Sequence, residues 1–267
     1  MSATAVAFRW LDGVLEPRDD CDVQPASIEA ADSWLTTDGR VLALDLHRER
    51  FRAAIPATHA AGAEVDAFWA AAIAEIPRTG DWFPRVEART QLGAPHLLFR
   101  LREAPPRNRS LVLATHRGRD PRTAPRIKGP DLEAMVRLRT GVQALGADDA
   151  VLLTPEGFVA EGSTTCLAWW RGDALAIPQD DIARIDSVTL RTVLALAAAT
   201  GVDVLHEEAR PDDLDGCEVW ALNALHGIRI VTSWIGGPAT AEQPGRLETW
   251  RRRLDALRRP MPGAEAA

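Results

Sequence analysis

The chain has 267 residues, of which 46% are hydrophobic and 26% charged. This composition is that of an ordinary globular protein, with enough chain for one large fold or two domains, and it excludes disordered and fibrous classes. The net charge of -7 argues against a nucleic-acid partner, and no apolar run is long enough to cross a membrane. Three widely spaced cysteines form neither a disulfide framework nor a paired metal motif, so we expect a cytoplasmic protein.

Residues 1–106 predict an N-terminal α+β domain. Its strands alternate apolar and polar residues, and its helices carry apolar residues every three or four positions. Consecutive prolines at positions 105 and 106, followed by polar residues, predict a linker at its end. In chain order we expect a hairpin at Asp12-Gly13, a hairpin at Asp38-Gly39, a helix beginning near Asp45 or His47, a helix over 63–76, and paired strands in FPRVEART and HLLFRLREA.

Residues 107–267 predict a second domain that is richer in strands. Short runs of apolar residues separated by turn signals predict its strands, and helical spacing with capping residues predicts its helices. The expected helices are 132–145 with Asp131 as a cap, 187–199 and a terminal amphipathic helix in LETWRRRLDALRR; the expected strands are in SLVLATH, DAVLLT, FVAEG, TTCLAWW, DALAIP, VDVLHEEA and EVWALNALHGIRIVTSWIG.

The chain contains 30 arginines and a single lysine, Lys128. Arginine can replace lysine wherever only the charge matters, but it does not deprotonate in proteins. A lysine can act as a neutral amine and bind a carbonyl group covalently. The retention of Lys128 therefore indicates a chemical role, although chance retention of one structural lysine would explain the count equally well.

The run IKGPDLEAMVRLRTGVQALGADDAVLLTPEGFVAEGSTT resembles the core signature of the class IV aminotransferase family, the fold-type-IV pyridoxal-phosphate enzymes. It has a lysine before a helix, a G-A-D-containing strand start, a turn and an E-G-S/T-S/T segment in that order. DGRVLALDLHRERF and DSVTLRTVLALA are similar to two further family motifs. The resemblance implies a two-domain α+β fold like that of D-amino-acid aminotransferase, each domain a β-sheet or barrel with flanking helices. It also implies the cofactor pyridoxal 5'-phosphate.

The resemblance assigns roles to individual residues. Lys128 matches the lysine that binds the cofactor and moves protons at the substrate Cα as base and acid. Glu161 matches the carboxylate that keeps the pyridine nitrogen protonated, and Arg50 matches the phosphate-binding arginine. Outside this motif context, Glu161 would be an exposed turn residue and Arg50 a surface arginine. The other expected cofactor-binding residues lie at a helix start, on the ring face and in a loop: Val188, Thr189, Ile185, Asn223 and Ala224.

Several residues depart from the family pattern. SIEAADSWL stands where the family carries an aromatic-Gly-Asp-Gly segment, and the chain has no tyrosine. Recognition of substrate by a tyrosine hydroxyl is therefore excluded. Cys166 replaces a common asparagine, and we interpret it as a packing residue. The histidines show no metal-ligand spacing, so we expect no metal site.

The motifs leave three functions open. The first is a lyase that converts 4-amino-4-deoxychorismate to 4-aminobenzoate and pyruvate, favoured because N-A-L in LNALHGI is similar to the loop of some lyases. The second is an aminotransferase acting on a D-amino or branched-chain amino acid, and the third a silent homologue that only binds. In either enzyme the substrate is a small amino-acid-like molecule, with Arg89 as its expected ligand, and the resemblance implies a homodimer. Nearby arginines that could hold a dicarboxylate with Arg89 are Arg100, Arg117, Arg119 and Arg122.

Overall fold

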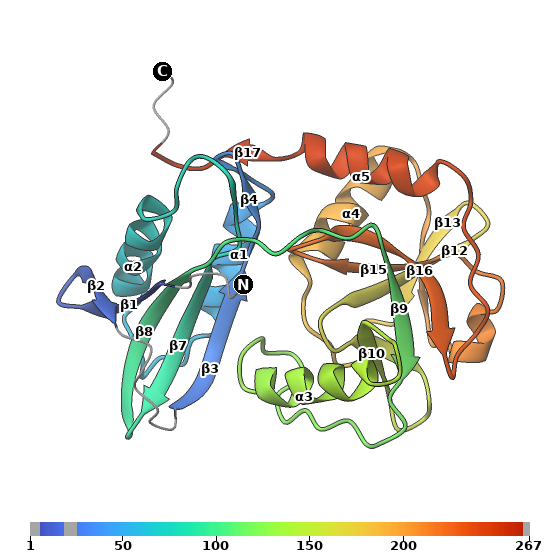
Figure 1. Ribbon diagram of the computed structural model, residues 1–267, viewed down its shortest axis with the longest axis horizontal. Helices are drawn as coiled ribbons and strands as arrows, with labels where there is room; N and C mark the ends of the chain where they lie inside the picture. Colours follow the sequence, from blue (N-terminus) through green and yellow to red (C-terminus); the bar gives the residue numbers. More distant parts are fainter. Residues whose placement is uncertain (1–5, 19–25, 264–267) are drawn as a thin grey trace. The chain divides into compact units, whose positions relative to one another are not determined.

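The computed structural model describes residues 6–18 and 26–263, so Cys21 lies outside the described residues (Figure 1). Within these ranges no helix is both long and apolar enough to cross a membrane. The chain forms two compact units. The expected domains, 1–106 and 107–267, differ from the units at two short segments. The first unit extends to Pro106 and adds Ile127–Pro130 and the segment from Leu257, whereas the second comprises Arg107–Arg126 and Asp131–Ala256.

The first unit is built on an antiparallel sheet of five strands in the order β2-β1-β8-β7-β3 (Figure 1). The expected hairpin at Asp12-Gly13 is confirmed, and both turn residues have positive φ angles, 47° and 87°. Strand β3 occupies most of SIEAADSWL, for which the sequence predicted no element. The strands are β1 Val6–Leu11, β2 Val14–Arg18, β3 Ala26–Ser33, β7 Arg85–Gln91 and β8 Ala94–Leu101.

Two helices bury the apolar face of this sheet. Helix α1 (Leu44–Ala54) packs against β3, and helix α2 (Gly62–Ala74) packs against β2, which confirms both expected helices. Large aromatic side chains fill the core between helices and sheet, including Trp34, Phe68 and Trp69, whose exposed fractions are 5% or less. A smaller sheet, in the order β17-β5-β4-β6, comprises Arg259–Pro260, Arg40–Val41, Thr36–Thr37 and Asp81–Trp82.

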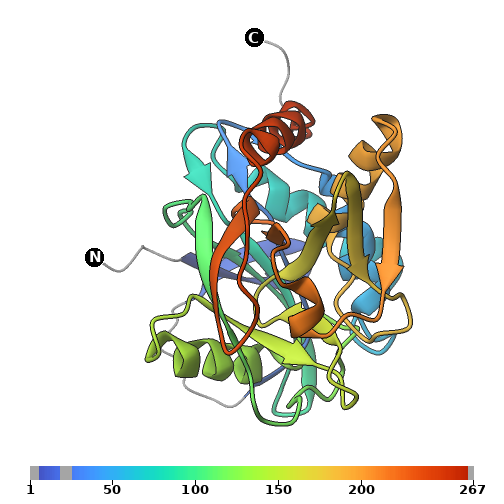
Figure 2. The same ribbon diagram turned by 90° about the vertical axis from the view of Figure 1, so that its right-hand side faces the viewer.

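The second unit is built on a mixed sheet of eight strands in the order β11-β10-β9-β16-β15-β12-β13-β14. Strand β9 pairs in parallel with both β10 and β16, and Figure 2 shows β9 and β16 side by side. The expected strands of this region are confirmed. Their bounds are β9 Ser110–Thr115, β10 Asp149–Leu153, β11 Val159–Gly162, β12 Cys166–Arg171, β13 Ala174–Pro178, β14 Val204–Glu207, β15 Val219–Asn223 and β16 Gly227–Ile235.

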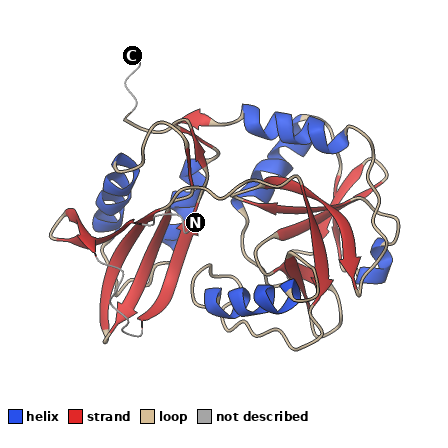
Figure 3. Ribbon diagram, in the orientation of Figure 1, coloured by secondary structure: helices blue, strands red, loops and turns tan. Residues whose placement is uncertain are grey.

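Helices lie around the sheet of the second unit (Figure 3). Asp131 precedes the first of them, but its carboxylate does not cap that helix as expected. It instead accepts hydrogen bonds from the backbone N–H groups of Thr123 and Ala124, at 2.8 and 2.9 Å, and so orders the preceding loop. The helices are α3 Leu132–Gln143, α4 Val188–Ala199, α5 Arg246–Ala256 and the short 3-10 helix η1 Pro211–Leu214.

Candidate active site

Lys128 lies beside strand β3 in the first unit. Its carbonyl oxygen accepts a hydrogen bond of 2.6 Å from the backbone N–H of Ala31. A Cβ atom on Gly129 would stand 2.7 Å from Cα of Ala30, closer than real side chains approach a backbone. Position 129 therefore requires glycine, which lets the lysine segment run directly against the strand.

The amine of Lys128 is desolvated and surrounded by positive charge. Burial and the charge of Arg50 together lower the pKa of Lys128 to about 8, although the carboxylate of Asp32 opposes both. Smaller contributions that lower it come from the charges of Arg85 and Arg102. An amine with this pKa is partly neutral near neutral pH, which a nucleophile or proton acceptor requires.

A buried carboxylate, Asp32 on β3, organises the residues beside Lys128. Arg50 donates to it through Nε and Nη2, both at 2.8 Å, and Nδ1 of His47 lies 2.8 Å from Oδ1. His47 and Arg50 stand three residues apart on α1, so one helix face presents both to the strand. Burial alone would raise the pKa of Asp32, but the charge of Arg50 and the hydrogen bonds outweigh it and lower that pKa.

The sequence indicated Arg50 but not its partner. Asp32 is fully buried, while Arg50 is 13% exposed, so the guanidinium is anchored at one edge by a bidentate ion pair. Burial also lowers the pKa of His47, which favours the neutral imidazole there.

In the second unit, Glu161 occupies β11 and is 5% exposed. Its carboxylate accepts a hydrogen bond from Nη1 of Arg122 and one of 3.2 Å from the backbone N–H of Ile185. Burial raises the pKa of Glu161 to about 7, whereas the charge of Arg122 acts in the opposite direction. Glu161 is therefore a positioned, desolvated carboxylate and not the exposed turn residue that its local sequence alone would suggest.

Arg122 is the ion-pair partner of the Glu161 carboxylate. Its side chain is 4% exposed, and it also pairs with Asp120 at 2.7 Å and donates to the carbonyl oxygen of Ala183 at 3.2 Å. The expectation that Arg122 helps to hold a dicarboxylate does not fit these contacts, because its donors are already directed at the chain's own oxygens. Sequence reasoning missed its pairing with Glu161, which lies 39 residues away.

The loop after Glu161 is held by a second buried aspartate, Asp149 on β10. Its carboxylate accepts hydrogen bonds from the hydroxyls of Ser163 and Thr165 and from the backbone N–H of Thr164. A Cβ on Gly162 would lie 2.7 Å from Oδ2 of Asp149. The glycine and hydroxyl residues of this motif therefore fold around Asp149, a role that the sequence did not reveal.

The start of helix α4 carries three of the expected cofactor-binding residues. Ser187 caps this helix by accepting a 3.3 Å hydrogen bond from the backbone N–H of Leu190, and Val188 and Thr189 in its first turn are each 2% exposed. Ile185 precedes the cap and donates its backbone N–H to Glu161. Backbone N–H groups in the first turn of a helix favour an anion such as a phosphate.

Asn223 is the last residue of β15, and Ala224 follows it in the turn to β16. The side chain of Asn223 donates to the carbonyl oxygen of Thr164 at 3.3 Å and accepts from the backbone N–H of His226 at 2.8 Å. Asn223 thereby links this loop to the loop that follows Glu161. Ala224 has no hydroxyl, so a ligand there would meet only its backbone groups.

Arg89, the expected substrate ligand, lies on β7 in the first unit, where Nε is 2.5 Å from Oε2 of Glu87. Among residues 6–18 and 26–263, no three His, Cys, Asp or Glu side chains gather as metal ligands. Cys166 is buried and its thiol donates to the carbonyl oxygen of Leu222 at 3.6 Å, which fits packing.

Comparisons with known proteins bear on the family and the fold of this chain. A family model described as amino-transferase class IV matches residues 29–234. No curated protein matches the sequence significantly.

Three solved structures illustrate the likeness of fold. A fold IV transaminase from Curtobacterium pusillum has a TM-score of 0.77 and 16% identity, over 94% of this chain and 99% of its own. A proposed 4-amino-4-deoxychorismate lyase from Legionella pneumophila has a TM-score of 0.74 and 16% identity, over 85% and 90%. A branched-chain aminotransferase from Thermoproteus uzoniensis has a TM-score of 0.74 and 19% identity, over 96% of each chain. The TM-scores of these structures support the expected α+β fold. Their sequence identities of 16–19% do not distinguish among the activities.

Proposed function

The chain belongs to the class IV aminotransferase family, and on that premise we propose that it is a lyase converting 4-amino-4-deoxychorismate to 4-aminobenzoate and pyruvate. The family is one of pyridoxal-phosphate enzymes, so the cofactor follows from membership. The substrate, the reaction outcome and the roles of individual residues are the proposal.

The observation that carries the assignment to a pyridoxal-phosphate enzyme is the state of Lys128, whereas the choice of a lyase rests on the loop that contains Asn223 and Ala224. Lys128 is the single lysine of the chain, and its desolvated amine has a pKa lowered to about 8. The remaining groups fit the cofactor chemically. Glu161 offers a buried carboxylate suited to a pyridine nitrogen. Arg50 in the first unit and the first turn of α4 in the second unit each carry donors suited to a phosphate.

Bound pyridoxal phosphate supplies an electron-withdrawing ring that stabilises negative charge at the carbon bearing the substrate's amine. Lys128 takes the proton from that carbon, which its lowered pKa permits near neutral pH. Glu161 would hold the ring and, as a carboxylate, would keep the ring nitrogen protonated. Asp32 holds Arg50 for the phosphate, and Arg122 holds Glu161.

The lyase reaction balances without a second substrate. The amine-bearing carbon loses its proton, the neighbouring carbon–oxygen bond breaks with its electron pair on oxygen, and the ring becomes aromatic. The departing enolpyruvate takes up one proton to become pyruvate, so no oxidant or amino acceptor is consumed. The loop containing Asn223 and Ala224 supports this choice, because its N-A-L sequence is similar to that of some lyases.

The alternative is an aminotransferase acting on a D-amino or branched-chain amino acid. The same lysine would serve, but the amino group would stay on the enzyme's cofactor until a 2-oxo acid accepted it. The two reactions therefore differ in their need for an acceptor.

The test supplies purified holoenzyme with 4-amino-4-deoxychorismate and no 2-oxo acid, and measures 4-aminobenzoate and pyruvate. We expect equal amounts of both products over many turnovers, and none with Lys128→Ala. An aminotransferase would instead convert D-alanine or a branched-chain amino acid once per site, resume on adding 2-oxoglutarate, and form no 4-aminobenzoate.

We further propose that the enzyme acts as a homodimer in the cytoplasm. The dimer rests on the family resemblance, and the cytoplasmic location rests on the three widely spaced cysteines. Sedimentation of the holoenzyme at several concentrations would test the dimer, and a monomer mass throughout would contradict it.

A further inference from the structure

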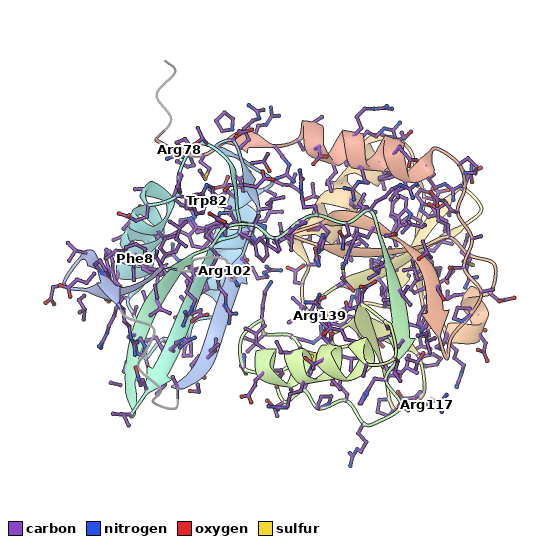
Figure 4. The ribbon with its side chains drawn as sticks, in the orientation of Figure 1. Phe8, Arg78, Trp82, Arg102, Arg117 and Arg139 are labelled. Atoms are coloured by element: carbon purple, nitrogen blue, oxygen red, sulfur yellow. The ribbon has the colours of Figure 1, made fainter. Side chains whose placement is uncertain are left out.

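The loop between β9 and α3 carries several arginines, and one of them is turned inwards. Arg117 is exposed at the edge of the second unit (Figure 4), and Arg119 and Arg126 are exposed as well. The side chain of Arg122, in contrast, is 4% exposed and reaches the carboxylate of Glu161. The loop therefore directs one particular guanidinium group to the buried carboxylate.

Asp120, two residues before Arg122, holds both the backbone and the side chain of this arginine. Oδ1 of Asp120 accepts a 3.0 Å hydrogen bond from the backbone N–H of Arg122, which closes a turn around Pro121. Nη2 of Arg122 lies 2.7 Å from Oδ2 of Asp120, and Nε lies 3.0 Å from both carboxylate oxygens. One edge of the guanidinium thus faces Asp120, while Nη1 faces Glu161.

The carboxylate of Asp120 is ionised near neutral pH. Burial alone would raise the pKa of Asp120, but the hydrogen bonds and the charge of Arg122 outweigh burial and lower it, and a charge on His116 acts in the same direction. Asp120 lines a cavity of about 400 Å³. The other carboxylates of this cavity are exposed, so water screens their charges: Glu156, Asp181 and Glu208.

The ion pairs around Arg122 leave one negative charge in excess. Asp120 and Glu161 each carry one negative charge, and Arg122 carries one positive charge. A protonated ring nitrogen at Glu161 brings this sum to zero, whereas without Asp120 it would leave a positive charge uncompensated in a desolvated place. A further arginine that acts on Glu161, Arg184, is itself paired with Asp180 at 3.3 Å.

We propose that Asp120 is a positioning residue that directs Arg122 to Glu161 and supplies the negative charge that balances a protonated ring nitrogen there. Burial raises the pKa of Glu161 to about 7, and the charge of Asp120 acts in the same direction as burial. The inference rests on the proposed function in taking the cofactor's ring nitrogen as the partner of Glu161. It adds a residue that the sequence did not indicate.

The test follows the ring nitrogen by NMR in holoenzyme loaded with isotope-labelled pyridoxal phosphate, at a series of pH values. In Asp120→Asn the ring nitrogen should lose its proton at lower pH, with proton affinity reduced roughly threefold to tenfold. Asparagine keeps the side-chain oxygen that accepts from the backbone of Arg122, so this variant removes the charge and preserves the turn. Arg122→Gln should shift the titration the opposite way, because it removes a positive charge. Glu156→Gln is the matched control, since it neutralises an exposed carboxylate of the same cavity.

A second readout uses the cofactor-free protein. Protonation of Glu161, followed by NMR of carbon-labelled glutamate and assigned by the signal lost in Glu161→Gln, should also move to lower pH in Asp120→Asn. An unchanged titration of either group in Asp120→Asn, or an equal shift in Glu156→Gln, would overturn the inference.

A shift in Asp120→Ala that Asp120→Asn lacks would assign Asp120 to the turn alone and would also overturn the inference. Failure of the native protein to bind the cofactor would refute the proposed function. The titration of Glu161 in cofactor-free protein would still decide whether the charge of Asp120 acts on this carboxylate.

Discussion

Replacement of Arg122 by glutamine should weaken cofactor binding through its effect on Glu161. In the native protein, burial raises the pKa of Glu161 to about 7 while the charge of Arg122 restrains it. An opposite charge at ion-pair distance lowers a carboxyl pKa by about 1–3 units, so its loss should leave Glu161 largely protonated near neutral pH. A neutral carboxyl is a poorer partner for a protonated ring nitrogen. With a pKa rise of about one to two units from about 7, the ionised fraction of Glu161 at pH 7 falls from about a half to about a tenth or a hundredth, so we expect the dissociation constant to increase roughly fivefold to fiftyfold.

The assay titrates the protein with pyridoxal phosphate at a series of pH values and monitors binding by the quenching of tryptophan fluorescence. Wild-type affinity should fall as the pH drops through about 7, because Glu161 takes up a proton. In Arg122→Gln the fall should occur at higher pH. Arg126→Gln is the matched control, since Arg126 is an exposed arginine of the same loop that donates to the carbonyl oxygen of Asp181. Equal pH profiles for wild type and Arg122→Gln would refute the reasoning.

Three further predictions concern the surroundings of Lys128. Acylation of Lys128 in cofactor-free protein should increase through about pH 8, because the neutral amine reacts and burial lowers its pKa; a midpoint near the ordinary 10.5, found by mass spectrometry, would contradict this. Asp32→Asn should lower the free energy of unfolding by about 3 kcal/mol, since it leaves buried His47 and Arg50 without their anion. Urea denaturation measures this, and a loss below about 0.5 kcal/mol, typical of a surface site, would count against the network. Gly129→Ala should reduce the visible absorbance of bound cofactor by pushing Lys128 away from β3, and an unchanged spectrum would show that the segment can move aside.

Much of the fold was predictable because the signals were local. Asp-Gly pairs marked the hairpins at 12–13 and 38–39, and apolar spacing marked α2. Strand β3 was missed because SIEAADSWL contains small and acidic residues with weak β propensity, and its pairing with β7 is a long-range contact. The missed strand carries Asp32, so the network that anchors Arg50 was missed as well.

In the candidate site, too, residues with a local signal were predicted and residues placed by long-range contacts were missed. Lys128 was indicated by composition and Glu161 by its motif, and both types of signal are visible in the printed sequence. The partners of these residues come from distant parts of the chain: Arg122 for Glu161, and Asp32 for Arg50. Asp131 is a further example, because its position suggested a helix cap whereas the folded chain directs its carboxylate to Thr123. Sequence patterns predict which side chains are present, but tertiary contacts decide which charges meet.

The central claim is that Lys128 carries the cofactor, and reduction of the holoenzyme with borohydride tests it most directly. Reduction converts the covalent link between amine and cofactor into a stable bond, which peptide mass spectrometry then locates. The account predicts one modified peptide, containing Lys128, and no modification in Lys128→Ala. A reduced adduct on any other amine of the native protein, or an adduct and visible band that persist in Lys128→Ala, would contradict it.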